Sequence, residues 1–189
     1  MQLKVITLNN LMQVIDKIIS NFKNNKSLYI GEKITMSDHM IQTAMLAEKS
    51  KCNEDLICSC LLHDYGHFIL EDPERLVKEN LNGEHEDIGY EYLKSVFKKE
   101  IVEPIKYHVQ AKRYLAKDKK YFDLLSEASK VSLKLQGGVL NNKECNKFEK
   151  QKYFKSTILL RKFDEAAKRI DIKMKSIYDY QKLLTSKLL

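Results

Sequence analysis

Glycine and proline are scarce in this chain, and their scarcity limits the folds that it can adopt. The 189 residues contain only six glycines and two prolines, so few positions offer the turns that join β-strands into hairpins. Lysine, glutamate, leucine, isoleucine and alanine favour helices instead. The sequence therefore predicts an all-α protein, and its length is that of one domain with a core of its own.

Charge, cysteine usage and hydropathy argue against several classes of protein. The formal net charge is +7, but acidic residues are interleaved with basic ones, as in "NKECNKFEKQKYFKSTILLRK", and no recognised nucleic-acid module is present. We therefore expect no nucleic-acid partner. No apolar stretch reaches the roughly 20 residues of a membrane span, so we expect no membrane partner either. The four cysteines form no CxxC pair and the chain starts without a signal-peptide pattern, which predicts a cytoplasmic protein.

Apolar periodicity predicts where the helices lie. The first covers residues 8–25, and the second follows "SLYIGEKIT" with Ser37 or Asp38 as its cap. The segment "EDLICSCLLHDYGHF" is the most apolar and is therefore the predicted central helix, with Gly66 relieving crowding where it ends. Further helices are predicted at about 84–100, 101–116, 120–135 and 152–180.

The stretch "LLHDYGHFIL" places two histidines and an aspartate in an apolar run, where ionisable groups are costly to bury unless they are paired. Imidazole with carboxylate suits Fe, Mn, Co, Ni or Zn, and the absence of thiolate from the pattern argues against a cysteine-rich structural zinc site. Three interpretations follow from the residues: satisfied polar groups of the core, a hydrolytic metal centre, or a metal centre that activates oxygen. The chain has five histidines: His39, His63, His67, His85 and His108.

A helical histidine upstream of "HDYGH" and two more downstream resemble the HD-domain superfamily over about residues 28–168. The segments "YIGEKITMSDHMIQTAMLA", "LLHDYGH", "HVQAKRYL", "SLKLQGG" and "LLRKFDEAAK" further resemble the PhnZ-like branch, oxygenases that cleave the carbon–phosphorus bond of α-hydroxyphosphonates. The resemblance implies a single HD-domain helical bundle over residues 1–189, with the N-terminal helix 8–25 and the C-terminal helix packed on it.

The resemblance also implies six metal ligands that hold two iron ions, a mixed-valent Fe(II)/Fe(III) pair, with O2 as co-substrate. Asp64 is the expected bridge between the metals. By spacing alone, Asp164 is not preferred over Asp123 or Asp171, and its assignment depends on "LLRKFDEAAK", where Phe163 stands in place of the usual tryptophan. The remaining ligands are expected to divide into His39, His63 and Asp164 at one iron and His85 and His108 at the other.

Three further residues resemble catalytic residues of this branch. His67 is similar to a residue that contacts substrate, and a hydrogen bond supporting a metal ligand is its alternative role. Tyr29 and Glu32 resemble a lid in which the tyrosine ligates the open iron at rest and the glutamate faces the cationic nitrogen of the substrate. Gly31, between them, is expected to supply mobility.

A set of polar side chains resembles the phosphonate-binding residues of the branch. Lys112 lies one helical turn after His108 and shares its face, while two serines and a glutamine recur at three- and four-residue spacing. A dianionic tetrahedral group needs several donors, among which arginine offers a planar fork and lysine a point charge. The expected set is Lys112, Ser129, Ser132, Gln136 and Arg161.

The resemblance to this branch implies an iron-dependent oxygenase with a small anionic phosphonate as its substrate. The expected reaction cleaves the C–P bond of a 1-hydroxy-2-aminoethylphosphonate, or an N-methylated analogue, to phosphate and glycine or glycine betaine. The alternative is a metal-dependent phosphohydrolase acting on a phosphate ester or nucleotide, because two metals can polarise a phosphoryl oxygen and generate hydroxide. A binding module with a decayed metal site is a third class, against which the six ligand types argue. Departures from the branch at Met36, Tyr65 and Phe163 leave the substrate size open, and the sequence leaves the oligomeric state open.

Overall fold

The computed structural model describes residues 8–29, 32–70 and 83–189. Within these ranges the chain is helical and forms no β-strand, only isolated bridges between Leu28 and Thr35 and between Phe97 and Leu188. The all-α prediction is thus confirmed, and none of the described helices is long and apolar enough to cross a membrane. The helices are α1 (Leu8–Asn24), α2 (Met36–Lys49), α3 (Glu54–Leu62), α5 (His85–Leu93), α6 (Lys99–Leu115), α7 (Lys119–Leu124), α8 (Glu127–Leu135), α9 (Asn142–Glu149), α10 (Phe154–Ala166) and α11 (Gln181–Ser186), with short 3-10 helices η1 (Tyr65–Phe68) and η2 (Ile177–Tyr180).

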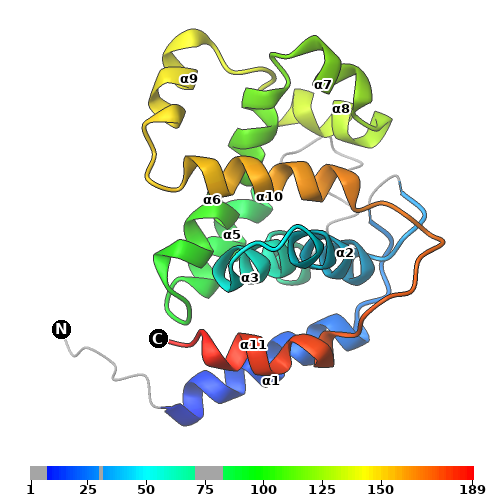
Figure 1. Ribbon diagram of the computed structural model, residues 1–189, viewed down its shortest axis with the longest axis vertical. Helices are drawn as coiled ribbons and strands as arrows, with labels where there is room; N and C mark the ends of the chain where they lie inside the picture. Colours follow the sequence, from blue (N-terminus) through cyan, green and yellow to red (C-terminus); the bar gives the residue numbers. More distant parts are fainter. Residues whose placement is uncertain (1–7, 30–31, 71–82) are drawn as a thin grey trace.

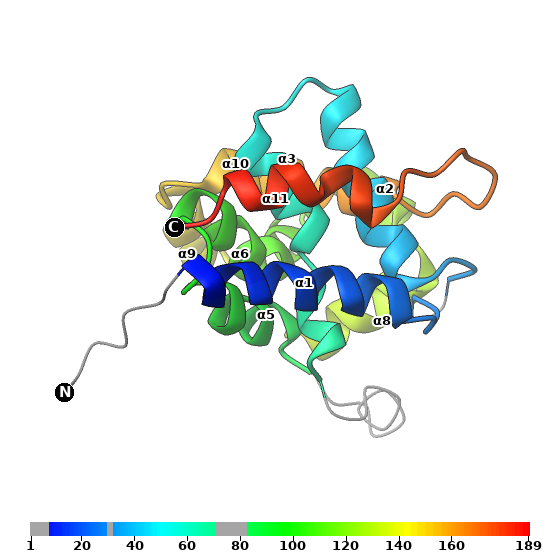
Figure 2. The same ribbon diagram turned by 90° about the horizontal axis from the view of Figure 1, so that it is seen from below.

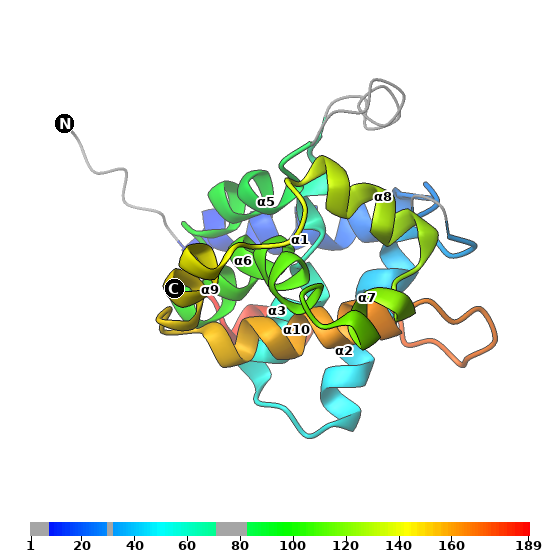
Figure 3. The same ribbon diagram turned by 90° about the horizontal axis from the view of Figure 1, so that it is seen from above.

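Helices α2, α3, α5, α6 and α10 form the centre of the molecule. The α2 helix packs on α3 and α10, α10 packs on α6, and α6 packs on α3 and α5. On one side of this group α1 and α11 lie next to each other (Figures 1 and 2). The opposite side carries α7, α8 and α9 (Figures 1 and 3), so segments far apart in sequence surround the central helices.

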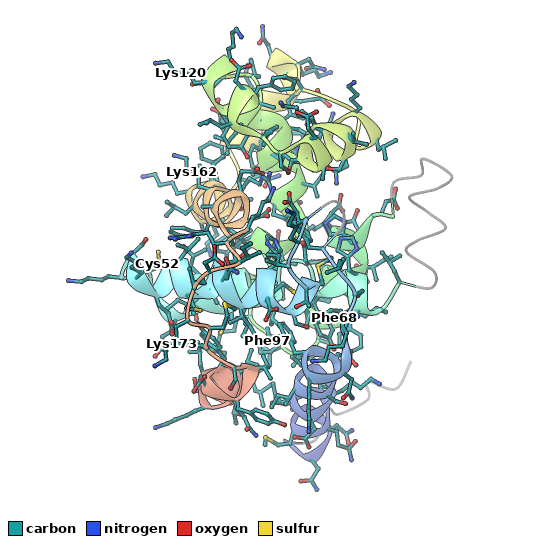
Figure 4. All side chains as sticks on the ribbon, turned by 90° about the vertical axis from the view of Figure 1, so that its right-hand side faces the viewer. Cys52, Phe68, Phe97, Lys120, Lys162 and Lys173 are labelled. Carbon is teal, nitrogen blue, oxygen red and sulfur yellow. The ribbon has the colours of Figure 1, made fainter. Side chains whose placement is uncertain are left out.

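The main hydrophobic cluster joins the central helices to α1, η2 and α11. Figure 4 shows Phe97 inside the molecule and Lys120 pointing outward at the α7 end. Phe97 is 1% exposed, and Phe22 of α1 contacts Phe68 edge-on with ring centroids 5.2 Å apart. Burial of such apolar side chains is the dominant stabilising contribution in a fold of this kind.

The cap of α2 differs from the expectation. Thr35 is the N-cap, and its Oγ1 accepts a hydrogen bond from the Asp38 backbone N–H at 3.0 Å. Ser37, one of the two expected caps, instead donates from Oγ to the Phe22 carbonyl at 2.8 Å. The hydroxyl of Ser37 therefore ties α2 to α1, a role that helix-capping rules do not reveal.

Several predicted helices were wrong in their extent. The helix predicted at 84–100 ends at Leu93, and the one at 120–135 divides into α7 and α8, each capped by its own side chain, Asp118 and Ser126. No helix was predicted over α9, although Asn141 and Glu144 form a capping box there.

The helix predicted at 152–180 ends at Ala166 because tertiary contacts occupy the backbone beyond it. The Ala167 carbonyl accepts from His39 Nδ1 at 2.9 Å. The Gln42 side chain donates to the Arg169 carbonyl at 2.6 Å and accepts from its N–H at 3.1 Å. Residues of α2 thus bind the backbone groups that a longer α10 needs for its own hydrogen bonds.

Candidate metal centre

Five of the central segments each contribute a buried imidazole or carboxylate to one place between them. His39 comes from α2, His108 from α6 and Asp164 from α10, while His85 is the first residue of α5. His63 and Asp64 were predicted to lie within a helix, but α3 ends at Leu62 and Asp64 has φ −101° and ψ 14°. This turn after α3 aims the two side chains at a common centre. All six expected ligands are less than 9% exposed: His39, His63, Asp64, His85, His108 and Asp164.

The first cluster joins two imidazoles and two carboxylates. The Nε2 atoms of His39 and His63 lie 3.2 Å apart. Asp164 Oδ1 lies 3.2 Å from His39 Nε2 and 3.7 Å from His63 Nε2. Asp64 Oδ2 completes the group at 3.4 Å from His63 Nε2 and 3.7 Å from His39 Nε2.

The second cluster is built around the other oxygen of Asp64. Asp64 Oδ1 lies 3.2 Å from His85 Nε2 and 3.3 Å from His108 Nε2, and these two nitrogens are 3.1 Å apart. One carboxylate therefore faces both clusters, with Oδ2 in the first and Oδ1 in the second. This is the arrangement required of a carboxylate that bridges two cations.

Backbone carbonyls set the orientation of three of the four imidazoles. The Nδ1 atoms of His39, His63 and His108 donate to the carbonyls of Ala167, Cys60 and Ile105 at 2.9, 2.9 and 2.7 Å. His85 differs, because its Nδ1 lies 3.4 Å from the Glu86 carboxylate oxygen Oε2. With Nδ1 engaged by a carbonyl, the Nε2 atom of each of these three imidazoles is the one left to bind a metal.

The electrostatics of these residues fit a bound cation. Burial by itself raises the pKa of both carboxyls, but His63 and the other facing imidazoles hold the pKa of Asp64 well below its usual range. Arg161, with facing imidazoles, does the same for the pKa of Asp164. Burial lowers the pKa of His63, yet the two carboxylates outweigh it and raise this pKa to about 10. Asp164 Oδ1 is buried and accepts no hydrogen bond from any described residue. The carboxylates thus favour positive charge between the imidazoles, and the nitrogen and oxygen donors suit a first-row transition metal.

Arg161 holds the second oxygen of Asp164. Its Nη1 donates to Asp164 Oδ2, its Nη2 to Glu165 Oε2, and its Nε to the Tyr121 hydroxyl at 2.9 Å. The guanidinium is 3% exposed. Arg161, which is expected to contact the phosphonate, therefore already donates to three protein groups.

His67 lies beside the second cluster. Its ring stacks on that of His85 with centroids 4.1 Å apart and an interplanar angle of 17°. Burial, reinforced by His85, lowers the pKa of His67 to about 3, so the imidazole is neutral. Its Nδ1 is buried and has no hydrogen-bond partner in the described part of the chain. A ring nitrogen of His67 is also near enough to Asp64 and His85 for the three to face one cation.

Tyr29 and Glu32 lie on the first cluster's side, and Gly31 between them is outside the described residues. The Tyr29 ring stacks on that of His39 with centroids 3.9 Å apart and an interplanar angle of 11°. Burial and the Asp164 carboxylate raise the pKa of Tyr29 well above its usual value. Glu32 Oε1 lies 3.3 Å from Lys168 Nζ, a residue outside the expected site.

The expected phosphonate-binding residues divide into two groups. Lys112 donates to Ser132 Oγ at 2.9 Å and is 6% exposed, and burial, with Arg161 next in effect, lowers its pKa to about 7. Gln136 ends α8 with its Oε1 buried and unpartnered among the described residues. Ser129 instead donates to Glu165 Oε2 at 3.0 Å and accepts from Lys168 at 3.1 Å.

Sequence reasoning missed four polar residues of this region: Glu86, Tyr121, Glu165 and Lys168. Lys168 follows Asp164 at four-residue spacing in the quoted segment "LLRKFDEAAK", so this motif held the signal that could have found it.

Tyr65, in contrast, lies away from the site. Its hydroxyl accepts from Asn21 Nδ2 of α1 at 2.8 Å, so this departure from the branch packs the core.

Comparison with known proteins places this centre in a family. The HD domain matches residues 36–134, more than half of the chain. The chain belongs to the HD-domain family. The matched region of this HD-domain protein contains five of the six expected ligands, and Asp164 lies beyond it.

Curated relatives identify the branch. A (1-hydroxy-2-(trimethylamino)ethyl)phosphonate dioxygenase (glycine-betaine-forming) of Leisingera caerulea is 44% identical over 145 residues, covering 76% of this chain and 74% of the relative. A hydroxymethylphosphonate dioxygenase of Gimesia maris is 35% identical over 156 residues, covering 80% and 77%. An uncharacterized protein of Acanthamoeba polyphaga mimivirus is 35% identical over 183 residues, covering 93% and 84%. The HD-domain protein thus belongs to the PhnZ-like oxygenase branch.

Proposed function

We propose that this HD-domain protein is an iron-dependent oxygenase that cleaves the carbon–phosphorus bond of a small α-hydroxyphosphonate. The observation that carries the proposal is the Asp64 carboxylate, whose two oxygens face separate pairs of imidazoles. Such a bridge suits two metals side by side, here a mixed-valent diiron pair. Both curated dioxygenases act on phosphonates by name, which supports oxygenase over phosphohydrolase chemistry.

The donor set supports an assignment of residues to each metal. His39, His63 and Asp164 would hold one and His85 and His108 the other, with Asp64 shared between them. When bound, the iron pair supplies the redox chemistry by which O2 oxidises the substrate. The buried apolar residues just before His63 exclude water from this chemistry, since Leu61 and Leu62 are both 0% exposed.

The remaining residues bind and orient the substrate. Lys112 provides a cation and, with Ser132 and the unpartnered Gln136, lies where it can hold phosphonate oxygens. His67 Nδ1, neutral and unpartnered among the described residues, can accept a hydrogen bond from the substrate hydroxyl. We assign Glu32 to the cationic nitrogen of an amine substrate and Tyr29 to the entrance beside His39. The guanidinium of Arg161 orients Asp164 and adds positive charge near the phosphonate.

The proposed reaction balances with O2 as its oxidant. A 1-hydroxyphosphonate and O2 give a carboxylate and orthophosphate: the C–P bond breaks, the hydroxylated carbon becomes the carboxyl carbon, and O2 is reduced as its atoms enter the products. With 1-hydroxy-2-aminoethylphosphonate the carboxylate is glycine. With the trimethylamino analogue it is glycine betaine, the product in the name of the Leisingera caerulea relative.

The test is phosphate release that depends on O2. The protein is purified anaerobically with Fe(II), and the trimethylamino hydroxyphosphonate or hydroxymethylphosphonate is added with and without O2. We expect phosphate and carboxylate in equal amounts, with equal O2 consumption. A phosphate monoester such as p-nitrophenyl phosphate is the matched hydrolase substrate. Release from this ester without O2, together with none from either phosphonate, would contradict the proposal.

A further inference from the structure

Lys168 has several polar partners at the edge of the candidate site. It follows α10, and its Nζ donates to Ser126 Oγ at 2.9 Å, to Ser129 Oγ at 3.1 Å and to Glu165 Oε1 at 2.9 Å. Glu32 Oε1 lies 3.3 Å from the same nitrogen. The Lys168 side chain is 12% exposed, and a lysine is rarely so buried unless it is paired.

The two carboxylates near Lys168 are held differently. Glu165 receives hydrogen bonds from Arg161, Ser129 and Lys168. Glu32 Oε1 is buried and lies next to Lys168, yet it accepts no hydrogen bond from the described residues. An unmade hydrogen bond to a buried charge is costly, so a better cationic partner would stabilise Glu32. Of the two carboxylates, Glu32 is therefore the one from which Lys168 separates more easily.

This ion pair lies beside the metal ligands. Lys168 Nζ is 5.9 Å from the centroid of the Tyr29 ring, and Tyr29 stacks on the first-cluster ligand His39. A cationic group that enters past Tyr29 therefore meets a glutamate that already has a positive partner. A substrate without a nitrogen carries no positive charge that could pair with Glu32.

We propose that Lys168 is a specificity-determining residue, which competes with the cationic nitrogen of a substrate for Glu32. The inference rests on the proposed function and adds a residue that the expected site did not contain. In this mechanism the Lys168 ammonium weakens the binding of an amine-bearing phosphonate and leaves that of a nitrogen-free phosphonate unpenalised. Loss of the Lys168 charge shifts the selectivity toward the cationic substrate, since Glu32 then lacks a competing partner.

The experiment compares two substrates in the iron-loaded enzyme and its Lys168→Met variant. The substrates are the trimethylamino hydroxyphosphonate, with a fixed positive charge, and hydroxymethylphosphonate, with none. We expect the ratio of kcat/KM for the cationic to the nitrogen-free substrate to rise about tenfold or more, since close charge pairs couple at least this strongly. The change should appear in KM rather than kcat, because Lys168 does not reach the reacting bond.

Two variants control for structural damage. Lys168→Arg keeps the positive charge and should keep the wild-type ratio. Ser126→Ala removes one hydroxyl contact of Lys168 and leaves both charges, so its ratio should also be unchanged. Circular dichroism and thermal unfolding check that each variant folds, and Lys168→Gln, which can still donate to the serines, replaces Lys168→Met if that variant does not.

Several outcomes would overturn the inference. An unchanged ratio in Lys168→Met means that Lys168 does not compete for Glu32, and an equal rise of both KM values means that it binds the phosphonate instead. If the wild-type enzyme turns over neither compound, the proposed function fails first. The same two compounds are then compared by anaerobic binding calorimetry, where Lys168→Met must tighten the cationic one selectively. Absence of binding to both compounds rejects the inference as well.

Discussion

The Arg161 guanidinium donates from Nη1 to Oδ2 of Asp164 and thereby leaves Oδ1 of that carboxylate facing His39 Nε2, 3.2 Å away. The two residues are three positions apart on α10, so they share a face of this helix. A buried carboxylate with a fixed cation on one oxygen keeps the other oxygen ionised and oriented. Arg161 therefore orients a candidate metal ligand.

Asp164→Asn should remove metal from the first cluster, because an amide oxygen carries no negative charge. We expect at least one of the two metals to be lost and turnover to fall by more than about 100-fold, the upper limit usual for residues that only support a ligand. Metal analysis of the purified variant measures the first effect. Asp171→Asn is the matched control, since Asp171 is exposed and should retain both metal and turnover. Wild-type metal content in Asp164→Asn would exclude this residue as a ligand.

Glu86→Gln should weaken the second metal alone. Glu86 is the charged neighbour of His85 Nδ1, at 3.4 Å, whereas the other three imidazoles donate to backbone carbonyls. A carboxylate at this position makes the imidazole a stronger ligand, so its neutral amide should lower metal affinity about 10–100-fold. Chelator competition gives the affinity. Glu91→Gln on the same helix changes an exposed carboxylate and should have no effect, and equal affinities in the two variants would disprove the role of Glu86.

Substrate binding should weaken as the pH rises through about 7, the value to which burial and Arg161 lower the pKa of Lys112. Below this pH the ammonium is charged and attracts the phosphonate, whereas above it the free enzyme must take up a proton to bind. The resulting rise in KM is at most about tenfold per pH unit. Lys112→Arg, which stays charged, should give a flat profile over the same range. A wild-type profile that is flat between about pH 6 and 9 would refute this account.

Gly66→Ala should destabilise the protein strongly, because η1 and α5 touch at this glycine. A Cβ at position 66 would lie 1.9 Å from the His85 carbonyl oxygen, a backbone atom that cannot move without displacing a candidate ligand. We expect a loss of about 3 kcal/mol or more in the free energy of unfolding, measured with urea. At Gly89 a Cβ would lie 3.1 Å from the Gly66 nitrogen, so Gly89→Ala should cost less. A larger loss of unfolding free energy in Gly89→Ala than in Gly66→Ala would contradict this interpretation of the contact.

The sequence by itself determined the fold class and the residue types of the candidate centre. Scarce glycine and proline with helical apolar periodicity predicted the all-α fold, since these are local properties of the chain. The resemblance to the phosphonate oxygenases singled out the six donor residues, and the structure brings them together. That they bind iron remains a prediction.

The tertiary structure decided which groups meet. Spacing did not distinguish Asp164 from Asp123 and Asp171, yet the latter two are exposed, whereas packing of α10 on α2 and α6 brings Asp164 to His39. The same packing ends α10, because His39 and Gln42 bind the backbone at Ala167 and Arg169. It also places Lys168 against Glu32. These contacts join residues more than 120 positions apart. Local sequence patterns do not reveal which residues so far apart in the chain come into contact.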